Sequence, residues 1–288
     1  MAGTDDDHIY LSLAEEHGDG DARWAFGTGF EDPLHGVETA VPAGVDAARL
    51  AADCAALADD ALVGAQRLAQ WCTRAPELEE EVALANIGLD LLGQARLLYT
   101  RAGQVDGSGR DEDAFAYFRD ADAFRPLRLA ELPNGDFAFC VVRLLWLASW
   151  RLALFTRLAH GAPDPVVAAV AGKGVKELTY HRQYAAEWAV RLGDGTEESH
   201  RRMRAALAAA APYTGELFTG APVCGVAPAE LRDEVTGVVR QVCDAAGLEL
   251  VQAPPLPGGG RDGEHTVHLA PLLEELQSVA RAHPEGVW

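Results

Sequence analysis

The residues best suited to metal chemistry are one histidine and two carboxylates in apolar helical windows. Glu177 and His181 lie four residues apart in VKELTYHRQYAAEW, and Asp90 lies in PELEEEVALANIGLDLLGQARLL. A di-iron site in a four-helix bundle needs a glutamate from each of two helices and a Glu-x-x-His pair from each of the others. Here Leu178 precedes His181 by three positions, and Gly93 follows Asp90 by three. The pattern predicts a bundle whose di-iron site has lost most of its ligands.

The other expected helices supply no replacement ligands. The segments 45–73 and 76–103 contain no histidine, and the segment 137–160 contains no Asp or Glu. We therefore expect no metal on this chain. A single imidazole on a helix is usually a hydrogen-bonded part of the structure, so we expect this of His181. Asp90 is expected to hydrogen bond in the core, and its natural partners are Arg143, Arg151 or Arg182.

Hydrophobic periodicity predicts an all-α fold, a four-helix bundle with one crossing connection and additional C-terminal helices. The expected long helices span 45–73, 76–103, 136–160 and 164–193, with a longer excursion between the second and third. Pro76 suits a first helical position and Gly103 a left-handed stop. Asp164 and Thr196 are expected N-caps. Later helices are expected from Thr196, from Pro228 to Ala246, and from His265 to Ala282, and 252–263 is expected to be a linker.

The same pattern divides the chain into two parts. Residues 1–44 are rich in Asp, Gly and Pro with little periodicity, and we interpret them as an acidic, flexible extension. Residues 45–288 form the expected helical domain.

Composition excludes several classes of partner and compartment. The formal net charge of −20 argues against nucleic acid, which is bound by concentrated positive charge. The five cysteines are odd in number and widely spaced, and no signal peptide is visible, so we expect a reducing cytoplasm. The apolar segment 137–158 is long enough to span a membrane, but Arg143, Arg151 and Arg157 recur within it. A buried bundle helix is the better interpretation.

The ordered motifs resemble a known family. They are GAQRLAQWCTRAPELEEEVALANIGLDLLGQARLL, LPNGDFA, ALFTRL, KELTYHRQ, RLGDGT and GEHTVHLAPLLEELQ, with a terminal Trp288. In this order they are similar to the C subunits of the ring-1,2-phenylacetyl-CoA epoxidase complex, over roughly residues 53–288. The resemblance implies a ferritin-like, non-catalytic structural subunit in a hetero-oligomer, with no cofactor of its own.

The resemblance also implies partners and a reaction. The homologous catalytic A subunit carries the di-iron centre, and a small B subunit and a flavin and iron-sulfur reductase complete the complex. The complex inserts one oxygen atom of O₂ into the ring of phenylacetyl-CoA in aerobic phenylacetate catabolism. Some relatives keep an acid in the third helix where this chain reads WLASW, with Ala148 at that position. The degenerate ligand positions are Asp90, Gly93, Ala148, Leu178 and His181.

Two other functions stay open at this point. The chain could be a di-iron oxygenase acting through its own carboxylates, or a module that binds CoA thioesters. The run HRRMR places Arg201, Arg202 and Arg204 on one helix, where they could contact coenzyme A phosphates or an acidic partner, although a solvated helix face is the default.

The remaining candidate residues are histidines and tryptophans. His265 and His268 form an i, i+3 pair that could bind metal in principle, but no acid or cysteine cluster is tied to them in sequence. Trp146, Trp150 and Trp188 are expected to be core or interface anchors.

Overall fold

The computed structural model describes residue 34 and residues 36–286 of the 288-residue chain. The chain divides into two compact units, Met1–Gly36 and Val37–Trp288, and the helices of the described part all lie in the second. Most of the predicted extension lies outside the described residues, so its boundary and flexibility stay predictions. Near that boundary, the carbonyl oxygen of Thr39 accepts a hydrogen bond of 2.7 Å from buried Arg101.

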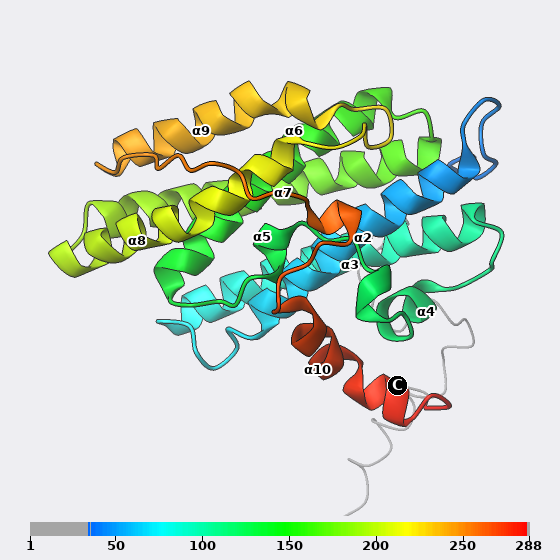
Figure 1. Ribbon diagram of the computed structural model, residues 1–288, viewed down its shortest axis with the longest axis horizontal. Helices are drawn as coiled ribbons and strands as arrows, with labels where there is room; N and C mark the ends of the chain where they lie inside the picture. Colours follow the sequence, from blue (N-terminus) through cyan, green and yellow to red (C-terminus); the bar gives the residue numbers. More distant parts are fainter. Residues whose placement is uncertain (1–33, 35, 287–288) are drawn as a thin grey trace, which may run out of the picture. The chain divides into compact units, whose positions relative to one another are not determined.

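Four long helices form the core of the described part, which is all-α apart from one isolated bridge between Val223 and Val226 (Figure 1). They are α2 (Ala47–Ala69), α3 (Leu78–Val105), α6 (Phe137–Gly161) and α7 (Pro165–Gly193). Helix α2 packs mainly against α3, and α6 packs mainly against α7. The excursion between α3 and α6 carries the short helices α4 (Glu112–Tyr117) and α5 (Arg128–Glu131). The predicted ferritin-like bundle is confirmed.

Helices α6, α7 and α8 (Glu197–Thr214) each begin directly after a residue whose side chain caps the first turn. Asp136, Asp164 and Thr196 each accept a hydrogen bond from the backbone N–H three residues later, as an N-cap does. Asp164 has a second role, because it also forms a fully buried ion pair with Arg101 of α3. The start of α7 is thereby tied to the opposite helix pair.

Two predicted helix ends were wrong. Pro76 lies outside α3, because a turn that includes Thr73 at φ +67° carries the chain to Glu77, the N-cap residue. Gly103 lies inside α3, where a Cβ atom would come within 1.9 Å of the carbonyl oxygen of Arg110. This glycine permits close approach of the following loop, and the helix ends at Val105.

The C-terminal third adds three helices around the bundle (Figure 1). Helices α8 (Glu197–Thr214) and α9 (Arg232–Ala245) contact α6 and α7, while α10 (Leu269–Ala282) contacts α4. The helix expected from Pro228 begins instead with a 3₁₀ turn, Pro228–Leu231. The helix expected from His265 begins at Leu269, because residues 250–268 form a largely non-helical segment, here called the C-terminal strap.

Helix α6 is long and apolar enough to cross a membrane by length and composition alone. However, 83% of its most apolar window is buried inside the protein, as in the core helix of a bundle. Its arginines Arg143 and Arg151 are buried too. The packing agrees with the interpretation of this segment as a bundle helix.

Candidate functional site

A chain of polar groups crosses the middle of the bundle and involves all four long helices. Arg151 of α6 donates from Nη1 to the carbonyl oxygen of Leu57 in α2 (3.0 Å) and from Nε to the side chain of Gln94 in α3 (2.8 Å). Gln94 in turn donates to Glu177 of α7 (2.9 Å), which pairs with Lys173 at 2.9 Å. A guanidinium thus lies where the four helices converge.

The charge of Arg151 is balanced only at a distance. Burial lowers the pKa of Arg151 to about 10, because removal from water disfavours the charged form, while Asp60 and Glu177 oppose this shift. Its Nη2 atom has no hydrogen-bond partner among the described residues. The guanidinium also lies over the ring of Phe155, 4.5 Å from the centroid, which offers a weak cation–π attraction.

The structure pairs Asp90 with His181, so the predicted arginine partner was wrong. The carboxylate accepts from Nε2 of His181 at 2.9 Å, and the side chain of Asp90 is 39% exposed. His181 is fully buried, as a hydrogen-bonded structural histidine would be. Arg143 instead donates to Leu132 and Asn134.

Three of the degenerate ligand positions are brought together. Ala148, Leu178 and His181 line one cavity of about 40 Å³ between the long helices. Gly93 lies elsewhere, next to Lys173 at the junction of α3 and α7, and a Cβ built there would meet the Lys173 Nζ at 4.0 Å. On α3 the cavity is lined by Leu91 instead of Asp90.

These residues do not fit a di-iron centre. Such a centre needs several carboxylates facing inward to bridge and neutralise two cations. Around the cavity the structure offers one buried acid, Asp60, which already pairs with Arg261. Glu177 is turned toward Gln94 and Lys173, and the cation Arg151 occupies the centre. Repulsion between this guanidinium and a metal cation in a buried site would be severe.

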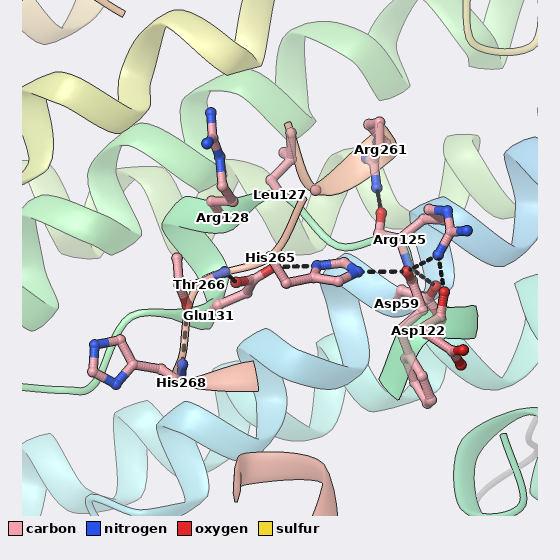
Figure 2. A network of polar contacts seen from close by, with 12 residues as sticks. Asp59, Asp122, Arg125, Leu127, Arg128, Glu131, Arg261, His265, Thr266 and His268 are labelled. Carbon is pink, nitrogen blue, oxygen red and sulfur yellow. Dashed lines mark hydrogen bonds and ion pairs between the residues drawn. The ribbon is translucent and has the colours of Figure 1, made fainter. Parts of the chain in front are cut away.

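A second polar network involves the adjacent acids Asp59 and Asp60 of α2, which were not singled out from the sequence; Figure 2 shows its Asp59 end. Asp59 accepts hydrogen bonds from the hydroxyl of Tyr99 (2.6 Å) and the backbone N–H of Arg125 (2.7 Å), and it pairs with Arg119. Asp60 accepts from the backbone N–H of Leu127 at 2.8 Å. The sequence did carry a signal for this network, because two adjacent acids inside an apolar helical window must find partners when the helix packs.

The same network fastens the C-terminal strap. Asp60 pairs with Arg261, whose Nη1 also donates to the carbonyl oxygen of Ala56 at 3.0 Å. Burial raises the pKa of Asp60, and the charge of Arg261 opposes this shift. Arg128 of α5 holds the strap at a second place. It pairs with Glu216 at 2.9 Å and donates to the carbonyl oxygen of Gly258 in the strap at 2.8 Å.

His265 belongs to this network, and its geometry does not suit the metal pair considered from sequence. Its Nδ1 lies 2.7 Å from the fully buried carboxylate of Glu131, and its Nε2 lies 3.0 Å from the carbonyl oxygen of Phe124. Since the carbonyl can only accept, Nε2 is the donor to Phe124. The rings of His265 and His268 point apart in Figure 2.

Two arginines of the run HRRMR on α8 pair with nearby acidic side chains at the surface. Arg201 and Arg202 both pair with exposed Glu198, at 2.8 Å and 2.7 Å, and Arg202 lies 3.7 Å from Asp136. Arg204 is exposed on the same helix. This arrangement is that of a solvated helix face and does not favour a CoA phosphate site.

The tryptophans lie in the core and at its edge. Trp146 and Trp150 are buried. Trp188 is half-buried and makes an edge-to-face contact with Phe137, at 5.1 Å between ring centroids.

These features define an all-helical, ferritin-like protein whose bundle centre holds a guanidinium and a small cavity. The sequence matches the family described as phenylacetic acid catabolic protein over residues 38–288. It is 41% identical over 240 residues to the C subunit of 1,2-phenylacetyl-CoA epoxidase from Escherichia coli (strain K12). That alignment covers 81% of this chain and 96% of the relative. The chain belongs to the phenylacetic acid catabolic protein family.

Replacing Gln94 tests the central polar chain. Gln94→Leu removes a hydrogen bond to a buried cation, so we expect the free energy of unfolding to fall by about 1.5–3 kcal/mol. The double variant Gln94→Leu with Arg151→Met removes the cation as well and should recover much of that loss, because an apolar pair of similar volume has no charge to solvate. Urea denaturation measures both. If the loss in the double variant equals the sum of the losses in the two single variants, Gln94 and Arg151 are not directly coupled.

Removing His265 tests the attachment of the C-terminal strap. His265→Ala leaves the buried carboxylate of Glu131 with the backbone N–H of Thr266 as a hydrogen-bond donor but without the imidazole. We expect a loss of about 1.5–3 kcal/mol and faster amide hydrogen exchange across residues 250–286. His268→Ala is the matched control, with little change in either quantity. Unchanged exchange in His265→Ala would show that other contacts hold the strap.

Proposed function

We propose that this chain is a non-catalytic structural subunit of a multicomponent phenylacetyl-CoA 1,2-epoxidase in aerobic phenylacetate catabolism. In this proposal it pairs with a homologous di-iron catalytic subunit, and the complex includes a small B subunit and a reductase. Family membership and the name of the E. coli relative support involvement in such a complex. The five unpaired cysteines, four of them buried, support a cytoplasmic setting.

The observation that carries the non-catalytic role is the position of Arg151. A catalytic bundle of this class concentrates carboxylates where its helices converge, and those carboxylates balance two metal cations. This chain has a buried cation at the convergence, with an alanine and a leucine at Ala148 and Leu178. The polar chain from Leu57 to Lys173 cross-links the bundle and supports a rigid scaffold role.

An exposed apolar seam on α3 supports pairing with another helical subunit. It consists of exposed Leu78, Val82, Leu89 and Leu92 with half-buried Ala85 between them, and the five follow one another at spacings of four, three, four and three residues. Leu78 is 71% exposed and Leu89 is 64% exposed, although large apolar side chains are normally covered. A four-three repeat is the pattern by which one helix packs along another at a small crossing angle. A helix of the homologous catalytic subunit fits this seam.

Iron loading tests the non-catalytic role. The purified chain is incubated anaerobically with ferrous iron, desalted and assayed for bound iron. We expect negligible retention, because Arg151 repels cations and the ligand-capable side chains Asp60 and His181 are already paired with Arg261 and Asp90. Close to two tightly held irons per chain would make this a catalytic subunit and overturn the proposal.

Substitution in the seam tests the pairing. Leu89→Asp places an unpaired charge in the proposed interface, so we expect affinity for the co-expressed catalytic subunit to fall at least about tenfold, which corresponds to about 1.4 kcal/mol. Affinity is measured by analytical ultracentrifugation. The matched control is Val267→Asp in the C-terminal strap, at a position that is 82% exposed.

Two results would contradict this prediction. Unchanged affinity in Leu89→Asp would place the interface elsewhere. Full solubility and activity of the catalytic subunit alone would remove the need for a scaffold.

A further inference from the structure

Two of the buried cysteines, Cys54 of α2 and Cys224, lie against each other although they are far apart in the sequence. Their thiols share a hydrogen bond, and this contact together with burial raises the pKa of Cys54 well above its usual value. Cys54 is 0% exposed and Cys224 is 6% exposed. Both are free thiols. A disulfide needs two sulfurs that already face each other, and this pair meets that requirement.

A tight turn presents Cys224 to α2. The first and last residues of the turn 223–226 pair through their backbones at 2.9 and 3.0 Å. The two residues between them, Cys224 and Gly225, have φ values of +46° and +91°. The carboxylate of Asp53, next to Cys54 in α2, accepts a hydrogen bond of 2.7 Å from the backbone N–H of Cys224. This hydrogen bond holds the turn against the helix at the level of Cys54.

A cysteine is an unusual residue for this backbone conformation. Positive φ is adopted readily by glycine and is enriched among asparagine, aspartate and histidine, but it is uncommon for other residues. Strained conformations of this kind persist where the surrounding structure imposes them, and they cluster at functional sites. Conformational preference therefore does not account for Cys224, and its thiol is the group to explain.

The surroundings give the two thiols different access to solvent. An open pocket of about 410 Å³ is lined by Cys224 and Asp53 but not by Cys54. A small oxidant in this pocket can reach Cys224 while Cys54 stays covered. The thiolate is the reactive form of cysteine, so the raised pKa of Cys54 makes it the poorer first nucleophile. Cys224 is thus placed to react first, and Cys54 is placed to react with the product.

We propose that Cys54 and Cys224 form a reversible disulfide when the chain meets hydrogen peroxide. The sulfur of Cys224 attacks one peroxide oxygen, the O–O bond breaks, and one water leaves, which gives a sulfenic acid at Cys224. The sulfur of Cys54 then attacks that of Cys224, the S–O bond breaks, and a second water leaves as the S–S bond forms. The two thiols lose two electrons and two protons, and the peroxide gains both.

The bond would lock the turn 223–226 to α2. A dithiol reductant reverses it by thiol–disulfide exchange. Disulfides in a reducing compartment are usually transient and redox-sensing, which suits a pair that is reduced at rest. The proposal rests on the contact between the thiols, the turn and the pocket, so it does not depend on the proposed scaffold role.

Peptide mapping after peroxide treatment tests the bond. The reduced full chain is treated with hydrogen peroxide under native conditions, the remaining thiols are alkylated, and the digest is analysed by mass spectrometry without reductant. We expect a peptide pair joined through Cys54 and Cys224 that is lost on treatment with dithiothreitol. If no such pair forms while exposed Cys72 is oxidised, or if it forms only after the chain is unfolded, the proposal is wrong.

Cysteine variants separate the roles of the two sulfurs. In Cys54→Ser the sulfenic acid at Cys224 has no resolving thiol, so we expect it to accumulate and to be labelled by dimedone, whereas the unchanged chain loses it to the disulfide. If Cys54→Ser does not fold, Cys54→Ala replaces it. Cys224→Ser should leave Cys54 reduced, because the pocket does not reach it. Dimedone labelling of Cys54 in that variant would overturn the proposed order of attack. The matched control is Cys243→Ser, which changes a buried cysteine of α9 and should leave the disulfide intact.

Discussion

The burial of one guanidinium is the constraint on which the centre of this bundle depends. Removing Arg151 from water is costly unless its donors are satisfied and its charge is balanced nearby. The structure meets this demand in part: a backbone carbonyl from α2 and the amide of Gln94 accept from Nη1 and Nε, Asp60 and Glu177 balance the charge from farther away, and Nη2 has no partner among the described residues. The same demand ties α2, α3, α6 and α7 together.

The two acids of α2 have a comparable role for the rest of the chain. Asp59 organises the connection between α3 and α6 through Arg119 and Arg125, and Asp60 fastens the C-terminal strap through Arg261. Buried carboxylates that must be satisfied therefore decide where long irregular segments lie. This explains how residues without regular structure, between positions 250 and 268, are held against the bundle.

The proposed scaffold role depends on the cross-linked core together with the exposed apolar seam on α3. Gln94 on α3 accepts a hydrogen bond from Arg151 in the core, and the same helix presents the apolar seam from Leu78 to Leu92 at its surface. Oxygen activation at a partner's di-iron site requires its helices to be held within about 0.5 Å of their productive geometry. A stiff neighbour packed along such a helix would supply that support, whereas a flexible neighbour would not.

Much of this protein could be predicted from local sequence. The long helices follow from apolar periodicity, and the starts at Asp136, Asp164 and Thr196 follow from caps, because both are short-range properties of the chain. The expected degenerate ligand positions were also named from sequence, Leu178 from its spacing to His181 and Ala148 from the family resemblance, and they stay predictions. By contrast, the partner of Asp90, the roles of Asp59 and Asp60 and the path of the C-terminal strap depend on how helices far apart in sequence are rotated and packed. Only the tertiary structure decided them, because a hydrogen bond between distant segments is set by the packing of whole helices and not by the spacing of residues within one.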